Sequence, residues 1–257
     1  MLSRPEILSL SVLAVLAVLL LLAALFAWRR TRYTLPQAVL YSVNTLVTRV
    51  LWRAQISGSL PLAPHEGGVI VSNHRSGIDP LLIQLTTKRV VHWMVAREYI
   101  EHPSMAWAFR ILRSIPVNRG GVDTAATKLA IRIAKQGGLV GNFPEARVNV
   151  TERLLLPGRS GAALIALRAR VRVVPCYVID PPYDGSALGP FLMTGKARVL
   201  VGSPLDLSEY FQREGEEGVL EEITKRFLIE IARLAGAHNF TPELAAKNRQ
   251  PRKQVQH

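Results

Sequence analysis

Residues 73–79 contain the side chains of this sequence that are best suited to acid–base chemistry. His74 and Asp79 stand five positions apart, directly after the short apolar run of residues 69–71. If the turn between them folds back, the Asp79 carboxylate accepts a hydrogen bond from one ring nitrogen of His74 and leaves the other free to take a proton. Such a pair is part of a catalytic triad without its nucleophile, which suits direct attack by a substrate hydroxyl or by water. The alternative is a loop histidine beside an aspartate that caps a helix.

The elements around this pair are those of an α/β domain. The β-branched run 69–71, preceded by two glycines and followed by Pro80, predicts a buried strand that leads into a turn and a helix. Further along the chain, strand-like and helix-like segments alternate, which is typical of an α/β fold. The predicted strands are residues 90–96, 115–117, 139–143, 171–179 and 197–201, and the predicted helices are residues 104–112, 123–136, 161–169 and 219–235.

A long apolar segment lies near the N-terminus. Residues 7–28 carry no charge, and three arginines follow within the next four positions. About 20 apolar residues rising 1.5 Å each span the ~30 Å hydrocarbon layer of a membrane. The length of the run, and its end in Phe26 and Trp28, favour an uncleaved anchor over a secretory signal peptide. The arginines predict that the bulk of the chain lies on the cytoplasmic side; a helix that enters one leaflet and returns is the alternative.

A second helix is expected directly after the anchor. Apolar side chains recur at intervals of three and four at Leu35, Val39, Leu40, Val43, Leu46, Val47, Val50 and Leu51. Such a stripe either packs on a protein core or lies on a bilayer, and both remain open here. The predicted organisation is a membrane anchor over residues 1–34, an amphipathic membrane-proximal helix over 35–60, a single domain over 61–240 and a basic disordered tail over 241–257.

The charge of the chain limits its possible partners. The formal net charge is +13, and 25 of the 32 basic residues are arginine, which binds phosphate groups in a bidentate manner. Nucleic acid or an anionic membrane would fit this charge, and the anchor together with the lack of any nucleic-acid-binding motif favours the membrane. Cys176 is the single cysteine and is expected to be a packed strand residue. The histidines outside the motif show no metal-ligand spacing, so we expect no metal. The sequence has no phosphate loop and no dinucleotide-binding fingerprint, so we expect no bound cofactor.

Four short motifs, in order, are similar to those of the glycerolipid acyltransferase family. The first motif, Asn-His, four residues and then Asp, matches Asn73, His74 and Asp79. The second is a short apolar strand that ends in an arginine, matched by residues 115–119, although Arg113 stands where the family usually has glycine. The fourth is an apolar strand with a proline, matched by residues 173–175.

The third motif departs from the family pattern. The family usually has Phe-Pro-Glu-Gly-Thr-Arg, whereas residues 143–148 read Phe-Pro-Glu-Ala-Arg-Val. Ala146 replaces the glycine, the threonine is missing, and Arg147 stands one position early. Because a glycine lets a phosphate approach the backbone, Ala146 either narrows that approach or selects another head group.

The resemblance implies a membrane-bound O-acyltransferase with a central, mostly parallel sheet flanked by helices. His74, oriented by Asp79, would take the proton from an acceptor hydroxyl as that oxygen attacks the thioester of an acyl-CoA or acyl-carrier protein. Arg119 would hold the acceptor phosphate, and Glu145 and Arg147 would shape the rest of its pocket. The acceptor would be a lysophospholipid, most simply lysophosphatidic acid, and the product phosphatidic acid, at the cytoplasmic face of the inner or plasma membrane.

Two other functions are compatible with parts of the sequence. An acyl-thioester hydrolase would use His74 and Asp79 to activate water, but it has no need of a phosphate-binding arginine at position 119. A non-catalytic lipid-binding protein of the membrane would account for the altered third motif, but it has no use for an oriented base. Within the acyltransferase hypothesis, the altered motif is also compatible with another lysophospholipid or with an amino-lipid such as a lyso-ornithine lipid.

Overall fold

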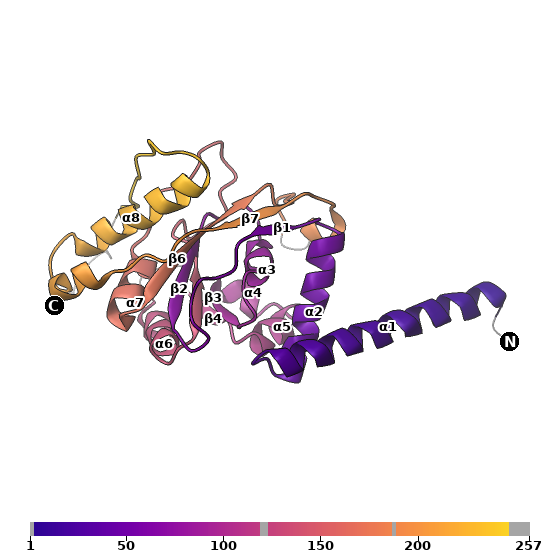
Figure 1. Cartoon of the computed structure of the whole chain (residues 1–257). Helices are drawn as coiled ribbons and strands as arrows, with labels where there is room; N and C mark the ends of the chain where they lie inside the picture. Colours follow the sequence, from indigo (N-terminus) through magenta and orange to yellow (C-terminus); the bar gives the residue numbers. More distant parts are fainter. Residues whose placement is uncertain (1–2, 119–122, 187–188, 247–257) are drawn as a thin grey trace, which may run out of the picture.

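A seven-stranded sheet forms the centre of the computed structural model, which describes residues 3–118, 123–186 and 189–246 of the chain (Figure 1). The order of the strands is β1-β7-β6-β2-β5-β3-β4, and in the described residues only the β6–β7 pair is antiparallel. The expected α/β fold with a mostly parallel sheet is therefore confirmed. The strands are β1 (Gln55–Ser57), β2 (Gly68–Ser72), β3 (Val91–Ala96), β4 (Ile115–Val117), β5 (Leu139–Asn142), β6 (Arg172–Ile179) and β7 (Arg198–Val201).

The central strand β2 shows why this sheet is buried on both faces. All five of its residues are buried, as expected for a short, continuous apolar run in a parallel sheet. Because side chains alternate along a strand, Val69 and Val71 point into one hydrophobic cluster and Ile70 into another on the opposite face. The domain thus has two cores that share one sheet.

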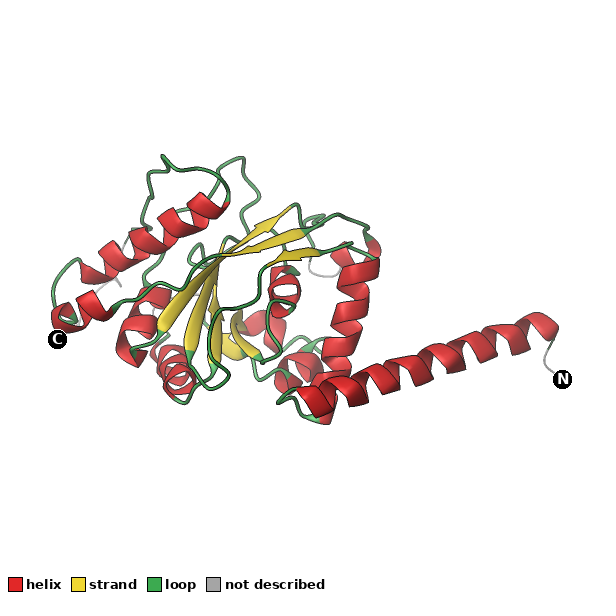
Figure 2. Cartoon of the chain, viewed as in Figure 1, coloured by secondary structure: helices red, strands yellow, loops and turns green. Residues whose placement is uncertain are grey.

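Helices cover both faces of the sheet (Figure 2). One core contains buried residues of α6, α7 and α8, and the other contains residues of α3 and of the segment that follows α2. The helices are α1 (Arg4–Arg30), α2 (Leu35–Val50), α3 (Asp79–Gln84), α4 (Arg97–Ile100), α5 (Ala106–Ile111), α6 (Thr124–Lys135), α7 (Gly161–Ala169) and α8 (Val219–Leu234), with 3₁₀ turns η1 (Gly189–Leu192) and η2 (Ser208–Arg213). The start of α6 is capped, since the Asp123 side chain accepts a hydrogen bond from the N–H of Ala126 at 2.9 Å.

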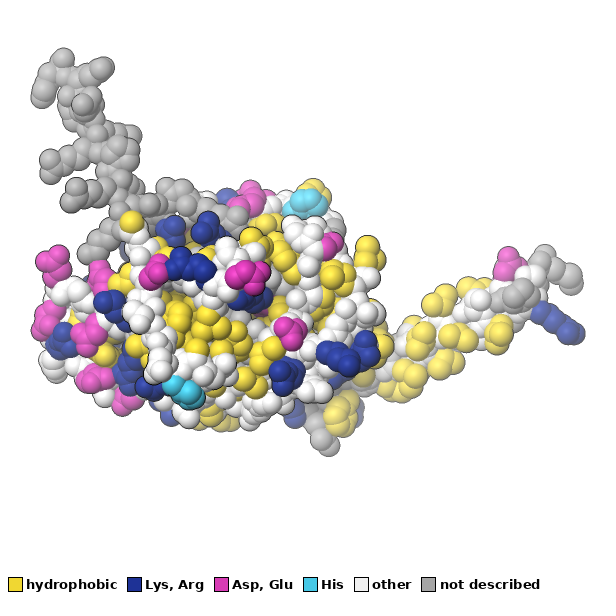
Figure 3. All heavy atoms as spheres, turned by 90° about the horizontal axis from the view of Figure 1, so that it is seen from above, with side chains coloured by type: hydrophobic (Ala, Val, Ile, Leu, Met, Phe, Trp, Pro, Cys, Tyr) yellow, Lys and Arg dark blue, Asp and Glu magenta, His cyan; other side chains and the backbone are white. Residues whose placement is uncertain are grey.

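Helix α1 stands out from the domain as a largely hydrophobic rod (Figure 3). Residues 8–26 have a mean hydropathy of 2.9, and most of their side chains are exposed. Among the described residues this is the one helix long and apolar enough to cross a membrane by length and composition. Its C-terminal end packs beside the start of α2, where Ala24 and Tyr33 are buried.

Helix α2 is shorter than predicted, and its two faces differ. It ends at Val50, and residues 55–57 form strand β1 beside β7, so the segment 35–60 is a helix followed by an edge strand of the sheet. One face of α2 packs on the domain, where the side chains of Gln37 and Asn44 donate to the carbonyls of Ile111 and Leu81. The opposite face is exposed, so only one face of the helix packs against the protein core.

The expectation of a disordered tail from residue 241 is wrong for its first residues. Glu243 accepts a backbone hydrogen bond from Gly158 at 2.9 Å, and Ala245 donates one back to Gly158 at 2.9 Å. Residues 241–246 therefore belong to the folded domain, because a distant loop supplies the hydrogen bonds that composition alone does not suggest. The rest of the predicted tail, residues 247–257, lies outside the described residues.

Candidate active site

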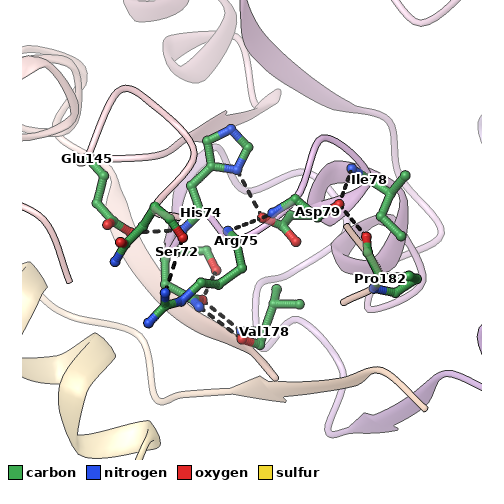
Figure 4. A network of polar contacts seen from close by, with 11 residues as sticks. Ser72, His74, Arg75, Ile78, Asp79, Glu145, Val178 and Pro182 are labelled. Atoms are coloured by element: carbon green, nitrogen blue, oxygen red, sulfur yellow. Dashed lines mark hydrogen bonds and ion pairs between the residues drawn. The ribbon is translucent and has the colours of Figure 1, made fainter. Parts of the chain in front are cut away.

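The site lies where the neighbouring parallel strands β2 and β5 end. His74 follows β2 by two residues, and Glu145 follows β5 by three. Because the two strands are parallel and in register from Gly68 and Leu139 onward, the segments that leave them meet at the same edge of the sheet. Clefts at the carboxyl ends of parallel strands are the usual position of ligand sites in such folds. Figure 4 shows the side chains that meet there.

The turn after β2 folds back so that Asp79 reaches His74. Asp79 Oδ2 lies 2.9 Å from His74 Nδ1 and also accepts hydrogen bonds from the backbone N–H groups of Arg75 and Ser76, at 2.7 and 2.9 Å. Asp79 is fully buried, whereas the His74 side chain is 16% exposed. With Nδ1 turned to the carboxylate, Nε2 is the ring nitrogen that remains available, on the side of the ring away from Asp79 (Figure 4).

Two aromatic rings support the imidazole from one side. The Phe143 ring stacks on the His74 ring with centroids 3.9 Å apart and planes inclined by 7°. Trp93 stacks on the far side of Phe143 at 4.7 Å. Gly141 makes room for this stack, since a Cβ atom there would come within 2.5 Å of the Trp93 ring. The three rings fix the plane of the imidazole, while Asp79 fixes its rotation.

Both carboxylate oxygens of Glu145 are hydrogen-bonded to backbone N–H groups of the site. Its Oε1 accepts a hydrogen bond from the N–H of His74 at 2.8 Å, and its Oε2 accepts one from the N–H of Leu156 at 2.7 Å. The residue is 3% exposed, and this burial raises the pKa of the carboxyl group, against the two N–H donors that lower it. Glu145 thus ties the third motif to the first; a direct contact with the acceptor stays a prediction.

The altered third motif keeps a backbone conformation that suits glycine. Ala146 has a φ of +57°, in the left-handed region, and its N–H donates to the carbonyl of Phe143 at 2.9 Å in a tight turn. The family glycine is explained by this φ, because glycine adopts it without steric cost. Ala146 adopts the same turn, and both it and Arg147 are exposed.

The structure brings together three of the five residues expected at the site. His74, Asp79 and Glu145 form one hydrogen-bonded group. Arg147 takes no part in this group and points to the surface as an exposed residue. Arg119, the expected phosphate-binding residue, lies outside the described residues.

Asn73, already part of the first motif, and the residues Arg75 and Asn149 have contacts at the site that were not expected from the sequence. The side chain of Asn73 bonds both backbone groups of Val178 in β6, at 2.9 and 2.7 Å, and so anchors the start of the motif. The N–H of Asn149 donates to the carbonyl of His74 at 2.7 Å. Arg75 extends its guanidinium to a loop that follows the third motif. The carbonyls it contacts are those of Asn149, Thr151, Arg153 and Leu154, at 3.1, 2.7, 2.7 and 3.4 Å.

Neither a metal nor a thiol nucleophile is indicated. In the described part of the chain, no three His, Cys, Asp or Glu side chains are grouped so that they could hold a metal ion. Cys176 is fully buried in β6, and this burial raises the pKa of its thiol to about 12. A neutral, inaccessible thiol is a packing residue and not a nucleophile.

Comparisons with known proteins agree with the motifs. A family model described as "Acyltransferase" matches residues 53–179, which include all of the motifs. Two curated relatives are 1-acyl-sn-glycerol-3-phosphate acyltransferases. The relative from Streptococcus pneumoniae is 26% identical over 172 residues, which are 66% of this chain and 61% of the relative. The relative from Bacillus subtilis is 23% identical over 158 residues, which are 61% of this chain and 75% of the relative.

A solved structure has the same fold. The crystal structure of the 1-acyl-sn-glycerophosphate (LPA) acyltransferase PlsC from Thermotoga maritima aligns with a TM-score of 0.55 and 21% identity. The alignment covers 83% of this chain and 95% of that one. The chain spans 61% of the length of the streptococcal relative. Together, the motifs, the family match over residues 53–179 and the fold support an assignment to the glycerolipid acyltransferase family.

Proposed function

We propose that this protein is a membrane-bound O-acyltransferase that moves an acyl chain from a thioester donor to the hydroxyl of a lysophospholipid, most simply lysophosphatidic acid. The observation that carries this proposal is the His74–Asp79 pair, in which the buried carboxylate holds Nδ1 at 2.9 Å and Nε2 is left for a substrate. The names of the curated relatives and the family match support the same reaction class.

In the proposed reaction His74 acts first as a base and then as an acid. Nε2 takes the proton of the acceptor hydroxyl as its oxygen attacks the thioester carbonyl, which gives a tetrahedral intermediate. When the intermediate collapses, the carbon–sulfur bond breaks and the imidazolium returns the proton to the leaving thiolate. The products are an ester and a free thiol. Asp79 stabilises the imidazolium that forms between the two steps, and no acyl-enzyme is required.

The binding of the two substrates is proposed from the motifs. Arg119 would hold the acceptor phosphate through paired N–H groups, and Glu145 and Arg147 would shape the rest of its pocket. The donor would be an acyl-CoA or an acyl-carrier protein, since both present the same thioester. Helix α1 would cross the membrane and leave the domain at the cytoplasmic face, beside the lipid acceptor.

The test is acyl transfer by the full chain in phospholipid vesicles. Labelled acyl-CoA and acyl-carrier protein are each offered with a panel of lysolipids, and His74→Ala is compared with His238→Ala, a change of an exposed histidine after α8. We expect transfer to lysophosphatidic acid to fall by roughly 10²- to 10⁴-fold in the first variant only. Release of free fatty acid without transfer would identify a hydrolase instead. Turnover that survives His74→Ala would overturn the proposed mechanism.

A further inference from the structure

We propose that the 3₁₀ turn η1 is a second membrane contact, which inserts into the surface of an anionic bilayer at the end of α2 farthest from α1. This inference rests on the membrane location proposed above and not on the acyl-transfer chemistry. In this proposal one apolar side chain of the turn inserts between the lipid head groups, and the cations around it contact those head groups.

The apolar side chain is Leu192, at the end of η1. It is 90% exposed, the highest value among the large hydrophobic side chains that the structure describes, and the preceding Phe191 is 41% exposed. A single exposed leucine is common on protein surfaces and has no meaning by itself. Leu192 is informative because of where it lies on the molecule and because of the residues that surround it.

The turn is held in place by the domain, so Leu192 is presented outward from a fixed support. The indole N–H of Trp52, a fully buried residue, donates to the carbonyl of Pro190 at 2.9 Å. The rings of Trp52 and Phe191 lie 5.5 Å apart. After the turn, the N–H of Gly195 donates to the carbonyl of Leu51 at 3.2 Å, which fastens the segment to the end of α2.

An exposed apolar stripe connects this turn with the membrane helix. Leu35, Val43, Leu46 and Val50 are exposed and lie on one face of α2, at helical spacing. Helix α2 has 16 residues and is therefore about 24 Å long. It begins at the end of α1 and runs across it, while η1 lies near its other end (Figure 1). A bilayer crossed by α1 would therefore meet the exposed face of α2 along its length and then the turn.

The charge around the stripe selects an anionic surface. The sequence contains no Asp or Glu from residue 7 to residue 65, and none from residue 185 to residue 205. Four exposed cations lie in these two stretches close to the end of α2 and the turn: Arg49, Arg53, Lys196 and Arg198. Such a combination of apolar and basic side chains binds anionic head groups, because the cations attract the surface and the apolar groups enter it. A second copy of the chain fits less well, since it would bring an identical set of cations to the contact.

Two membrane contacts would fix the orientation of the domain on the bilayer, which one contact cannot do. A domain attached only through α1 can rotate about the short link between α1 and α2. A second contact, separated from the first by the length of α2, removes that rotation and gives the domain one orientation on the bilayer. The edge of the sheet that carries His74 would then keep a constant height above the lipid surface.

The test places a fluorophore on the turn. Leu192→Cys is labelled with a polarity-sensitive probe in the full chain, and the matched control is Leu129→Cys on the exposed face of α6, on the other side of the sheet. The native Cys176 is fully buried and does not compete for the label, which unlabelled wild-type protein verifies. Both proteins are reconstituted into vesicles that contain phosphatidylglycerol and, separately, into vesicles of phosphatidylcholine alone.

We expect the probe at position 192 to shift its emission to the blue and to be quenched by spin-labelled lipids in the anionic vesicles, with a smaller effect in the neutral ones. The probe at position 129 should remain accessible to aqueous iodide in both. Equal quenching of the two probes by iodide would overturn the proposal. Protection of position 192 that grows with protein density and is insensitive to lipid quenchers would also overturn it, in favour of a contact between copies. The readout needs no turnover, so it stands or fails separately from acyl transfer measured on the same samples.

Discussion

Asp79 has two roles at the site, because one of its oxygens serves three donors. Oδ2 accepts from the imidazole of His74 and from two backbone N–H groups of the same turn. A change that removes this oxygen would affect the orientation of His74 as well as the shape of the turn. Asparagine keeps one oxygen acceptor but loses the negative charge that would stabilise an imidazolium in the proposed reaction.

For Asp79→Asn we therefore expect kcat to fall by roughly 10²- to 10⁴-fold while KM for the acceptor changes little. Steady-state kinetics in vesicles measures both values. Thermal unfolding of the variant serves as the control, since the three hydrogen bonds to the remaining oxygen can persist. A large rise in KM with normal kcat would contradict a role in proton transfer.

The raised pKa of Glu145 predicts how the stability of the folded protein depends on pH. Burial raises the pKa of this carboxyl group above its ordinary value of 4.5. The folded state therefore holds the proton more tightly than the unfolded state, so the free energy of unfolding decreases as the pH rises from about 4.5 to the folded pKa and is constant above it. The stabilising contribution of this group is present at low pH and is lost as the pH rises.

The variant Glu145→Gln removes this titration. We expect the difference in unfolding free energy between wild type and variant to change between pH 4.5 and the folded pKa of Glu145 and then to level off. In addition, the new amide NH₂ faces a backbone N–H of His74 or Leu156, which costs roughly 1–3 kcal/mol at all pH values. Chemical unfolding in detergent across the pH range measures both effects. A difference that is independent of pH would show that the raised pKa is not present in the folded protein.

At the scale of elements, Arg75 connects two segments that the sequence separates widely. Its guanidinium contacts carbonyls of the loop at residues 149–154, and the same loop returns an N–H from Asn149 to the carbonyl of His74. The N–H of Leu156, just after the loop, reaches Glu145. The loop thus supports the motif that contains His74, although none of the side chains of the loop is expected to touch a substrate.

For Arg75→Ala we expect faster hydrogen exchange in residues 148–156 and a fall in kcat of at least tenfold, because the loop loses four hydrogen bonds and the backbone of His74 loses its support. Arg75→Lys should recover part of the activity, since an ammonium group reaches fewer carbonyls than the planar guanidinium. The matched control is Arg159→Ala, which changes an exposed arginine three residues after the segment 148–156. Unchanged exchange in the loop would refute this account.

The elements themselves were largely predictable from the sequence, and the exceptions share a cause. The runs at residues 69–71 and 139–142 have the continuous apolar pattern of buried parallel strands, and α6 has a capping aspartate and a glycine stop. In contrast, β1 is three residues of mixed polarity, and it is a strand only because β7 lies beside it. A strand defined by a distant partner leaves no local signal.

The site was predictable to a similar extent. The pair His74–Asp79 was found because its spacing lies within one turn of chain. The roles of Glu145 and Arg75 depend on backbone N–H and carbonyl groups far along the sequence. Because the backbone groups are nearly the same in every residue, a sequence pattern does not reveal which of them a side chain contacts. For the same reason, the docking of residues 241–246 on Gly158 was missed.

At the scale of the whole molecule, the proposed attachment to the membrane depends first on α1. Its side chains around residues 16–19 are exposed and would lie near the middle of a bilayer. An arginine at the centre of a spanning helix costs about 2.5–3.5 kcal/mol on the insertion scale. Two arginines there should therefore outweigh the gain of inserting the helix.

We expect the double variant Leu16→Arg/Leu19→Arg to be released from membranes by alkaline carbonate, whereas wild type stays in the membrane fraction. The control is Leu129→Arg, an equal change of charge per site on the exposed face of α6. Retention of the double variant under these conditions would mean that α1 does not span the bilayer and that the attachment is peripheral.

The pairing of β1 with β7 has a consequence for how the protein is made. The register joins Gln55, near the start of the chain, to Arg198, which is synthesised much later. While a ribosome is still extending the chain, α1 and α2 are already available to the membrane, but β1 has no partner. The edge of the sheet can close only after β7 has emerged, so β1 is synthesised long before it can be locked in place. Biogenesis of this protein would therefore proceed from a tethered, incomplete sheet to the finished domain, with targeting preceding folding.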